Sequence, residues 1–315
     1  MRMGESNRVV VFRPLAALAI PLAAAGACIP DVEPDVFVVP RCEQVAPTCG
    51  PAADESCCAA GEVVGGQFNR LNDVRYPATV ADFQLDRFEA TVGRFRQFVA
   101  GYPATRPKAG VGAHPLIQGS GWDPAWDASL PAGQDELRAS LQCDSNFRTW
   151  TDEPAGNEAA PINCVSWYLA FAFCAWDEGR LPTEAEWNYA AVGGNDHRAY
   201  PWGDEAPSQD LAVFDCDTTT TVCPIPSVGS KSPAGDGRWE QADLAGSLFE
   251  WVLDYHADLT GTCTNCAALT DGGFGRGSRG GAFSHTEETL SPTYRIGELP
   301  ERALSFYGFR CARDE

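Results

Sequence analysis

The chain has 315 residues, of which 44% are apolar and 10% aromatic, so it can bury the core of one large domain and is not a disordered chain. Its 31 glycines and 23 prolines predict much irregular structure and long, well-anchored loops. Its formal charge of -20 excludes a nucleic-acid surface, because binding to phosphate backbones needs clustered Lys and Arg.

The N-terminal segment has the features of an export signal. Three arginines precede an apolar run that ends at Ala27 and is too short and too rich in alanine to be a membrane span. We predict a signal peptide of the lipoprotein type at residues 1–27, because small residues lead directly to Cys28, which would be acylated. The alternative is ordinary signal-peptide cleavage, which leaves Cys28 unmodified.

The cysteine content indicates an oxidising compartment. The chain has 13 cysteines and only 2 methionines, and cytosolic proteins rarely carry so many thiols without metal sites. If Cys28 is acylated, 12 cysteines remain, an even number that can pair completely. Residues 28–60 are rich in proline and acidic residues and lack a helical or strand period. We expect a tether there, held by two local crosslinks whose pairing stays open among Cys42, Cys49, Cys57 and Cys58.

The first regular elements are expected after residue 77. Residues 78–90 alternate between apolar and polar side chains, as in a half-buried strand. Thr91 then has the position of a helix N-cap, and an apolar helix face follows until Gly101 ends it. Residues 102–160 are expected to be mostly loop.

Two adjacent helices are expected in the middle of the chain. Ser166 begins a segment that is apolar on nearly every side and stops at Gly179, which predicts a buried helix. Thr183 and Glu186 form a capping box, which predicts the start of a second helix. Beyond residue 200 the sequence is rich in glycine and aromatic residues, and it predicts short strands joined by long loops.

Five motifs in a fixed order extend over residues 65–315. They are PINCVSWYLAFAFCAWDEGRLPTEAEWNYAA, YPWGDE, DLAGSLFEWVLD, SRGGAF and YGFRCARD. In this order they resemble the formylglycine-generating enzyme, or sulfatase-modifying factor, superfamily. The resemblance implies an α+β fold related to C-type lectins: a single disulfide-rich domain at residues 61–315 with little regular secondary structure.

The resemblance also implies an oxidase chemistry that this sequence lacks the ligands to perform. Family enzymes convert a sulfatase cysteine to formylglycine with copper held by two cysteines just after an RGGS-like turn. Here that turn is at residues 279–282, and no cysteine occurs between Cys266 and Cys311. His285 stands about where the first thiolate would be. Because copper(I) prefers a pair of soft thiolates, we expect no copper and no formylglycine synthesis.

An altered oxidase centred on His285 is the alternative. The resemblance implies that Arg295 and Trp251 line the same cleft, so these three residues are the weak candidates for a catalytic set.

The resemblance further implies a structural calcium site. The family's calcium-binding turn corresponds here to Gly246, Ser247 and Glu250, which offer the hard oxygen ligands that calcium prefers. The alternative is that Glu250 is a loop carboxylate hydrogen-bonded to backbone amides.

Several disulfides are expected in the domain. The resemblance implies a bridge from the cysteine of the AFC helix to that of the GFRC motif, Cys174–Cys311. For the CxxC pair, a structural bridge is favoured over a redox or zinc site, because a second CxxC and a thioredoxin setting are lacking. The CxxC pair is Cys263–Cys266, and Cys143–Cys164 and Cys216–Cys223 complete the set as hypotheses without a separate derivation.

The leading functional hypothesis is an exported, lipid-anchored protein of a bacterial cell envelope, in the outer membrane or the periplasm, with surface exposure as a further option. Its domain would bind a protein or glycan partner or act as a structural module. The competing hypotheses are the altered oxidase around His285 and calcium-dependent carbohydrate binding through Glu250.

Overall fold

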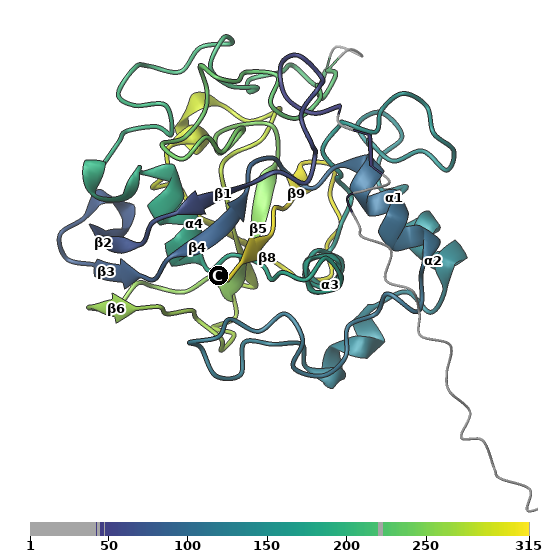
Figure 1. Cartoon of the computed structure of the whole chain (residues 1–315), viewed down its shortest axis with the longest axis horizontal. Coiled ribbons are helices and arrows are strands. Elements are labelled where there is room, and N and C mark those ends of the chain that lie inside the picture. The colour runs from purple at the N-terminus through teal and green to yellow at the C-terminus, as the bar shows by residue number, and fades with distance from the viewer. Residues whose placement is uncertain (1–41, 43–44, 47, 220–222, 315) are drawn as a thin grey trace, which may run out of the picture. The chain divides into compact units, whose positions relative to one another are not determined.

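The computed structural model describes residues 42–314 apart from 43, 44, 47 and 220–222. All described residues belong to one compact unit (Figure 1). Among them, no helix has the length and hydropathy needed to cross a membrane.

Regular elements are short, as the glycine and proline content predicts. The strands are β1 Ala60–Val63, β2 Gly66–Asn69, β3 Pro77–Val80, β4 Phe83–Asp86, β5 Phe249–Tyr255, β6 Cys263–Thr264, β7 Arg276–Arg279, β8 Ile296–Glu298, β9 Tyr307–Gly308 and β10 Ala312–Arg313. The α-helices are α1 Val92–Ala100, α2 Gln134–Ser140, α3 Trp167–Trp176 and α4 Glu184–Ala191, and the 3-10 helices are η1 Arg70–Asn72, η2 Pro124–Ser129, η3 Gly194–Asp196 and η4 Glu287–Leu290.

Three small sheets join segments that are distant in the sequence. Their strand orders are β1-β4-β10, β2-β3-β6 and β8-β7-β5-β9. The C-terminal β10 pairs antiparallel with the early β4, with Ala312 opposite Leu85, and β9 pairs in parallel with β5. Figure 1 shows the yellow C-terminal part of the chain beside the blue strands β1 and β4. The C-terminal strand β10 is therefore in the same sheet as the early strands β1 and β4.

The three predicted helix starts are present with their caps. The Thr91 hydroxyl accepts a hydrogen bond from the backbone of Arg94, and the Ser166 hydroxyl accepts one from Leu169. At α4 the Thr183 side chain and the Glu186 carboxylate each accept a bond from the other's backbone N–H, as in a capping box. Local sequence therefore decides where α1, α3 and α4 begin.

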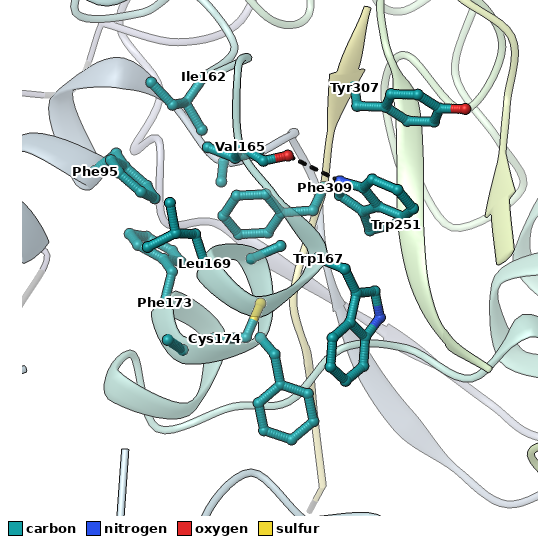
Figure 2. Packing of buried hydrophobic residues seen from close by; sticks show 14 of the residues in the cluster. Phe95, Ile162, Val165, Trp167, Leu169, Phe173, Cys174, Trp251, Tyr307 and Phe309 are labelled. Carbon is teal, nitrogen blue, oxygen red and sulfur yellow. Dashed lines mark hydrogen bonds between the residues drawn. The ribbon is translucent and has the colours of Figure 1, made fainter. Parts of the chain in front are cut away.

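Helix α3 lies in the main hydrophobic core, where eight of its ten residues are buried. Phe173 stacks on Phe95 of α1 with ring centroids 5.4 Å apart, and the Trp167 indole donates to the Val252 carbonyl of β5 at 2.8 Å. Figure 2 shows side chains from α1, α3 and β5 meeting around this helix. Each large apolar side chain buried in this way contributes about 1.5–3 kcal/mol.

Two predicted segments differ from the structure. The strand expected at residues 78–90 is divided into β3 and β4, because the residues between them bond to other segments: Ala81 donates to the Asn265 side chain at 2.7 Å, and Asp82 accepts from the Gly65 N–H at 2.7 Å. The expected loop at 102–160 contains α2, which buries only Leu137 and so has almost no apolar period.

All 12 cysteines from Cys42 onward are paired. The pairs are Cys42–Cys58, Cys49–Cys57, Cys143–Cys164, Cys174–Cys311, Cys216–Cys223 and Cys263–Cys266. The last four are the pairs expected from the sequence. Disulfides in this number indicate an oxidising, extracytoplasmic location.

The N-terminal cysteines are part of the fold. Cys49 and Cys57 are buried and share a small core with Phe88 and Val228. The described part of the segment expected as a tether, from Cys42 onward, is therefore folded onto the domain, and Cys28 lies outside the described residues.

Candidate functional site

The loop that follows β7 is shaped by two glycines. Gly280 and Gly281 have positive φ angles of 98° and 78°. A Cβ on Gly281 would lie 2.9 Å from the Thr289 carbonyl oxygen, so no other residue fits this close approach without displacement. The tight turn folds the following residues back onto the domain, with Ala282 and Phe283 fully buried.

His285 lies in this loop in an aromatic environment. Its ring meets those of Phe249 and Phe306 with centroids 5.0 and 5.1 Å away, and its Nδ1 is 3.3 Å from the Ser284 hydroxyl. Burial lowers the pKa of this imidazole, so it is neutral at physiological pH. A neutral, half-buried imidazole is able to accept or pass on a proton, but it is one ligand only. The described residues contain no group of three or more His, Cys, Asp or Glu side chains placed to hold a metal ion.

The other two candidate catalytic residues have different surroundings. Trp251 is buried, stacks on Tyr307 at 4.5 Å and donates its indole N–H to the Val165 carbonyl at 3.1 Å (Figure 2). Arg295 forms an ion pair with Glu184. Within the described part of the chain, His285, Trp251 and Arg295 share no hydrogen bond, ion pair or ring contact. Each of the three side chains is therefore held by different partners, and their common role stays a prediction.

One chain segment bonded to the His285 loop carries a disulfide. The backbone N–H of Asp215 donates to the His285 carbonyl at 2.8 Å, and that of Cys216 donates to the Phe283 carbonyl at 2.9 Å. Cys216 is bonded to Cys223. The sulfur atoms beside this loop are therefore oxidised.

The turn expected to bind calcium is occupied by internal hydrogen bonds. Both oxygens of Glu250 accept bonds from Arg310, at 2.6–3.0 Å, and one also accepts from the Trp187 indole at 2.8 Å. The Ser247 hydroxyl donates to a second carboxylate, Glu89, at 2.8 Å. With its carboxylate held by a guanidinium, this donor set does not fit a calcium ion. Among the described residues, the Glu250 carboxylate accepts bonds from Arg310 and Trp187 side chains and none from a backbone amide, so that alternative is wrong as well.

Two more carboxylates lie near this turn and were not anticipated. Burial, together with the charges of Asp243 and Glu250, raises the pKa of Glu89 well above its ordinary value. Burial likewise raises the pKa of Asp243 to about 6. Charged residues inside otherwise apolar motifs, such as Arg310 in YGFRCA, were the available signal, since a buried charge needs a partner.

A second buried ion-pair cluster was also missed. Glu184, the first residue of α4, pairs with Arg279 at 3.1 Å and with Arg295 at 2.5 Å. Burial alone would raise the pKa of Glu184, but these two guanidinium groups hold it below its usual value. Asp254 accepts from the Glu184 N–H at 2.7 Å, and burial with the nearby Glu184 charge raises its pKa to about 7.

The cavity beside this cluster holds about 20 Å³, room for one water molecule. The cluster is therefore a structural junction between α4 and β7, without space for a substrate.

Comparison with known proteins decides the family. The sulfatase-modifying factor enzyme 1-like domain family matches residues 44–315. The chain belongs to this family. Its fold agrees with that assignment, because the structure of PvdO from Pseudomonas aeruginosa superposes with a TM-score of 0.55 over 81% of this chain and 94% of that one, at 17% identity.

Curated relatives of this sulfatase-modifying factor domain have different activities by name. It is 31% identical over 174 residues to a formylglycine-generating enzyme of Thermomonospora curvata (49% of this chain, 55% of that protein) and 29% identical over 263 residues to an inactive C-alpha-formylglycine-generating enzyme 2 of Bos taurus (74% and 78%). It is also 32% identical over 158 residues to the serine/threonine-protein kinase pkn1 of Chlamydia pneumoniae (49% and 24%). The chain thus spans about a quarter of that kinase's length, and family membership alone does not assign an activity.

Proposed function

We propose that this chain is an exported, lipid-anchored protein whose sulfatase-modifying factor domain does not make formylglycine and acts as a binding or structural module at the cell envelope. One observation carries the proposal. All 12 cysteines of the described residues are in disulfides, and the loop behind Gly281 has His285 but no cysteine. Copper(I) bound for this oxidation needs a thiolate pair, which a lone imidazole does not replace.

The test is an aldehyde assay on a cysteine-containing sulfatase peptide. The purified mature chain is incubated with the peptide, oxygen and a copper salt, with the Thermomonospora curvata enzyme as the active control. We expect no aldehyde above the protein-free blank, because no thiolate pair is available to bind copper and activate the substrate thiol. Repeated turnover to aldehyde by the purified chain would overturn the proposal.

The competing proposal is a different oxidase around His285. It is favoured by the neutral, half-buried imidazole beside Phe249 and Phe306, which is shielded as a catalytic group would be. Oxygen consumption, measured in the same incubation as the aldehyde, separates the two proposals. Oxygen consumption without aldehyde that is lost in His285→Ala would support the oxidase, and no oxygen consumption would support the binding module.

The lipid anchor is proposed from Cys28 and the export signal before it. In a bacterial host that acylates lipoproteins, the full-length chain should partition into the detergent phase of a Triton X-114 extract. Cys28→Ser should move it to the aqueous phase, because acyl chains supply the membrane affinity. Equal partitioning of the two forms would rule out the anchor.

A further inference from the structure

An open groove of about 600 Å³ lies between α2 and the segment 148–152. We call it the α2 groove. It shares no lining residue with the His285 loop or with the two buried ion-pair clusters. Its lining includes Asp135, Arg138, Gln142, Arg148, Trp150 and Asp152.

The α2 groove is lined by two arginines without side-chain partners among the described residues, whereas Asp152 accepts from the Trp150 indole at 3.1 Å. Among the described residues, neither Arg138 nor Arg148 makes a side-chain hydrogen bond or ion pair, although Asp135 lies on the same helix as Arg138 and in the same groove. The Nε of Arg138 is shielded from solvent and has no acceptor. The exposed Arg148 and the partly exposed Arg138 still have guanidinium N–H groups that are free to donate to an external acceptor.

The walls of the groove are fixed before any ligand arrives. Arg96 of α1 lies over the Trp150 ring at 4.6 Å and donates to the Thr151 carbonyl at 2.8 Å. On the other side, the Gln134 side chain ties α2 to the Val99 carbonyl at 2.7 Å, and Leu137 is fully buried. Figure 1 shows α2 beside α1. Binding groups on such a held backbone lose little conformational entropy when a ligand binds.

The lining favours a ligand with one kind of anionic group and several hydroxyls. Two guanidinium groups suit a carboxylate, which Arg recognises through paired hydrogen bonds. Asp135 and Asp152 disfavour a polyanion of higher charge density, such as a polyphosphate, but they are good acceptors for hydroxyl groups, and Gln142 is both donor and acceptor. A sugar acid carries these groups together.

We propose that the α2 groove binds an acidic saccharide, with Arg138 and Arg148 on the sugar carboxylate and the two aspartates on neighbouring hydroxyls. This inference rests on the proposed function as a binding module and gives that module a ligand class. It requires no calcium, because every contact is made by side chains of the groove.

The experiment measures binding of the full mature chain, in EDTA, to oligomers of galacturonic acid by calorimetry. Neutral galactose oligomers and oligoglutamate of equal length are the comparison ligands. We expect binding of the galacturonate oligomers only. In Arg138→Gln/Arg148→Gln the affinity should fall at least tenfold with an unchanged melting temperature, because neither arginine has a partner in the fold. Arg302→Gln removes an exposed arginine outside the groove and should bind as the wild type does.

Absence of galacturonate binding, or equal binding by the double variant, would overturn the proposal. Binding of oligoglutamate in place of the saccharide would do the same, because it would assign the groove to an acidic peptide. None of these outcomes bears on the aldehyde assay, so failure of the saccharide proposal is distinguishable from failure of the proposed function.

Discussion

Three buried carboxylates, Glu89, Asp243 and Glu250, share the surroundings of one guanidinium, that of Arg310. Glu250 forms the direct ion pair, so little charge is left to compensate the other two. In a buried site the remaining carboxyl groups resist ionisation, and the pKa of Asp243 rises to about 6. At this turn the Glu250 carboxylate is held by the Arg310 guanidinium.

The raised pKa of Asp243 predicts that the free energy of unfolding depends on pH. A carboxyl group whose pKa is higher in the folded than in the unfolded chain stabilises the fold below its ordinary pKa of 3.8, and that stabilisation is lost as the pH rises through about 6. Asp243→Asn keeps an acceptor for the Gly229 N–H and stays neutral. We expect the variant to be more stable than wild type by about 2 kcal/mol at pH 7.5 and by much less at pH 4, measured by urea unfolding.

Asp210→Asn is the control, because Asp210 is exposed. It should follow the wild-type pH dependence. An Asp243→Asn variant that is less stable than wild type at pH 7.5 would contradict the raised pKa of Asp243, because it would mean that the fold favours the ionised carboxylate.

Helix α4 begins at a cap that contains a buried, ionised carboxylate. Its capping box uses Glu186, whose carboxylate also accepts two bonds of 2.7 Å from Arg180. Burial alone would raise the pKa of Glu186, but Arg180 and His114 lower it to about 2. The cap therefore depends on a carboxylate that stays ionised down to strongly acidic pH.

Thr183→Ala removes the hydroxyl half of the capping box. The free energy of unfolding should fall by about 1 kcal/mol, because the Glu186 N–H loses its acceptor. Thr270→Ala, at an exposed loop position without a hydrogen bond in the described structure, should change it by less than about 0.5 kcal/mol. Urea unfolding of both variants measures the difference, and equal losses would mean that the cap does not stabilise α4.

The elements that could be predicted are those whose signals are local. Thr91, Ser166 and Thr183 each precede an apolar segment, and their caps depend on residues three positions away. Helix α2 could not be predicted, because its position depends on Leu137 packing beneath it and on Gln134 reaching α1. The division between β3 and β4 depends on Asn265, 184 residues beyond Ala81.

At the scale of the whole molecule, motif order predicted the fold but not the contacts within the site. The pairing of Glu250 with Arg310 spans 60 residues, and that of Glu184 with Arg295 spans 111. Sequence spacing has no signal for such partners, although it does show that a charge inside an apolar motif needs one. For the same reason the ion pair of Arg295 with Glu184 at the start of α4 was not anticipated.

The disulfides give the molecule its overall closure. Cys174 of α3 is joined to Cys311 next to β10, a separation of 137 residues, and the C-terminal β10 pairs with β4 in the same region. All 12 cysteines of the described residues are in these bridges, so this part of the chain has the family fold and no free thiol. The central claim is that the sulfur atoms of this domain serve structure and not catalysis.

Its most direct test is a count of free thiols. The mature protein is unfolded in denaturant without reductant, treated with an alkylating agent and mapped by mass spectrometry. We predict no alkylated cysteine in residues 42–314, with the six disulfide-linked peptide pairs recovered intact. Two alkylated cysteines in residues 42–314, in a protein whose native form binds one equivalent of copper(I) before alkylation, would contradict the account.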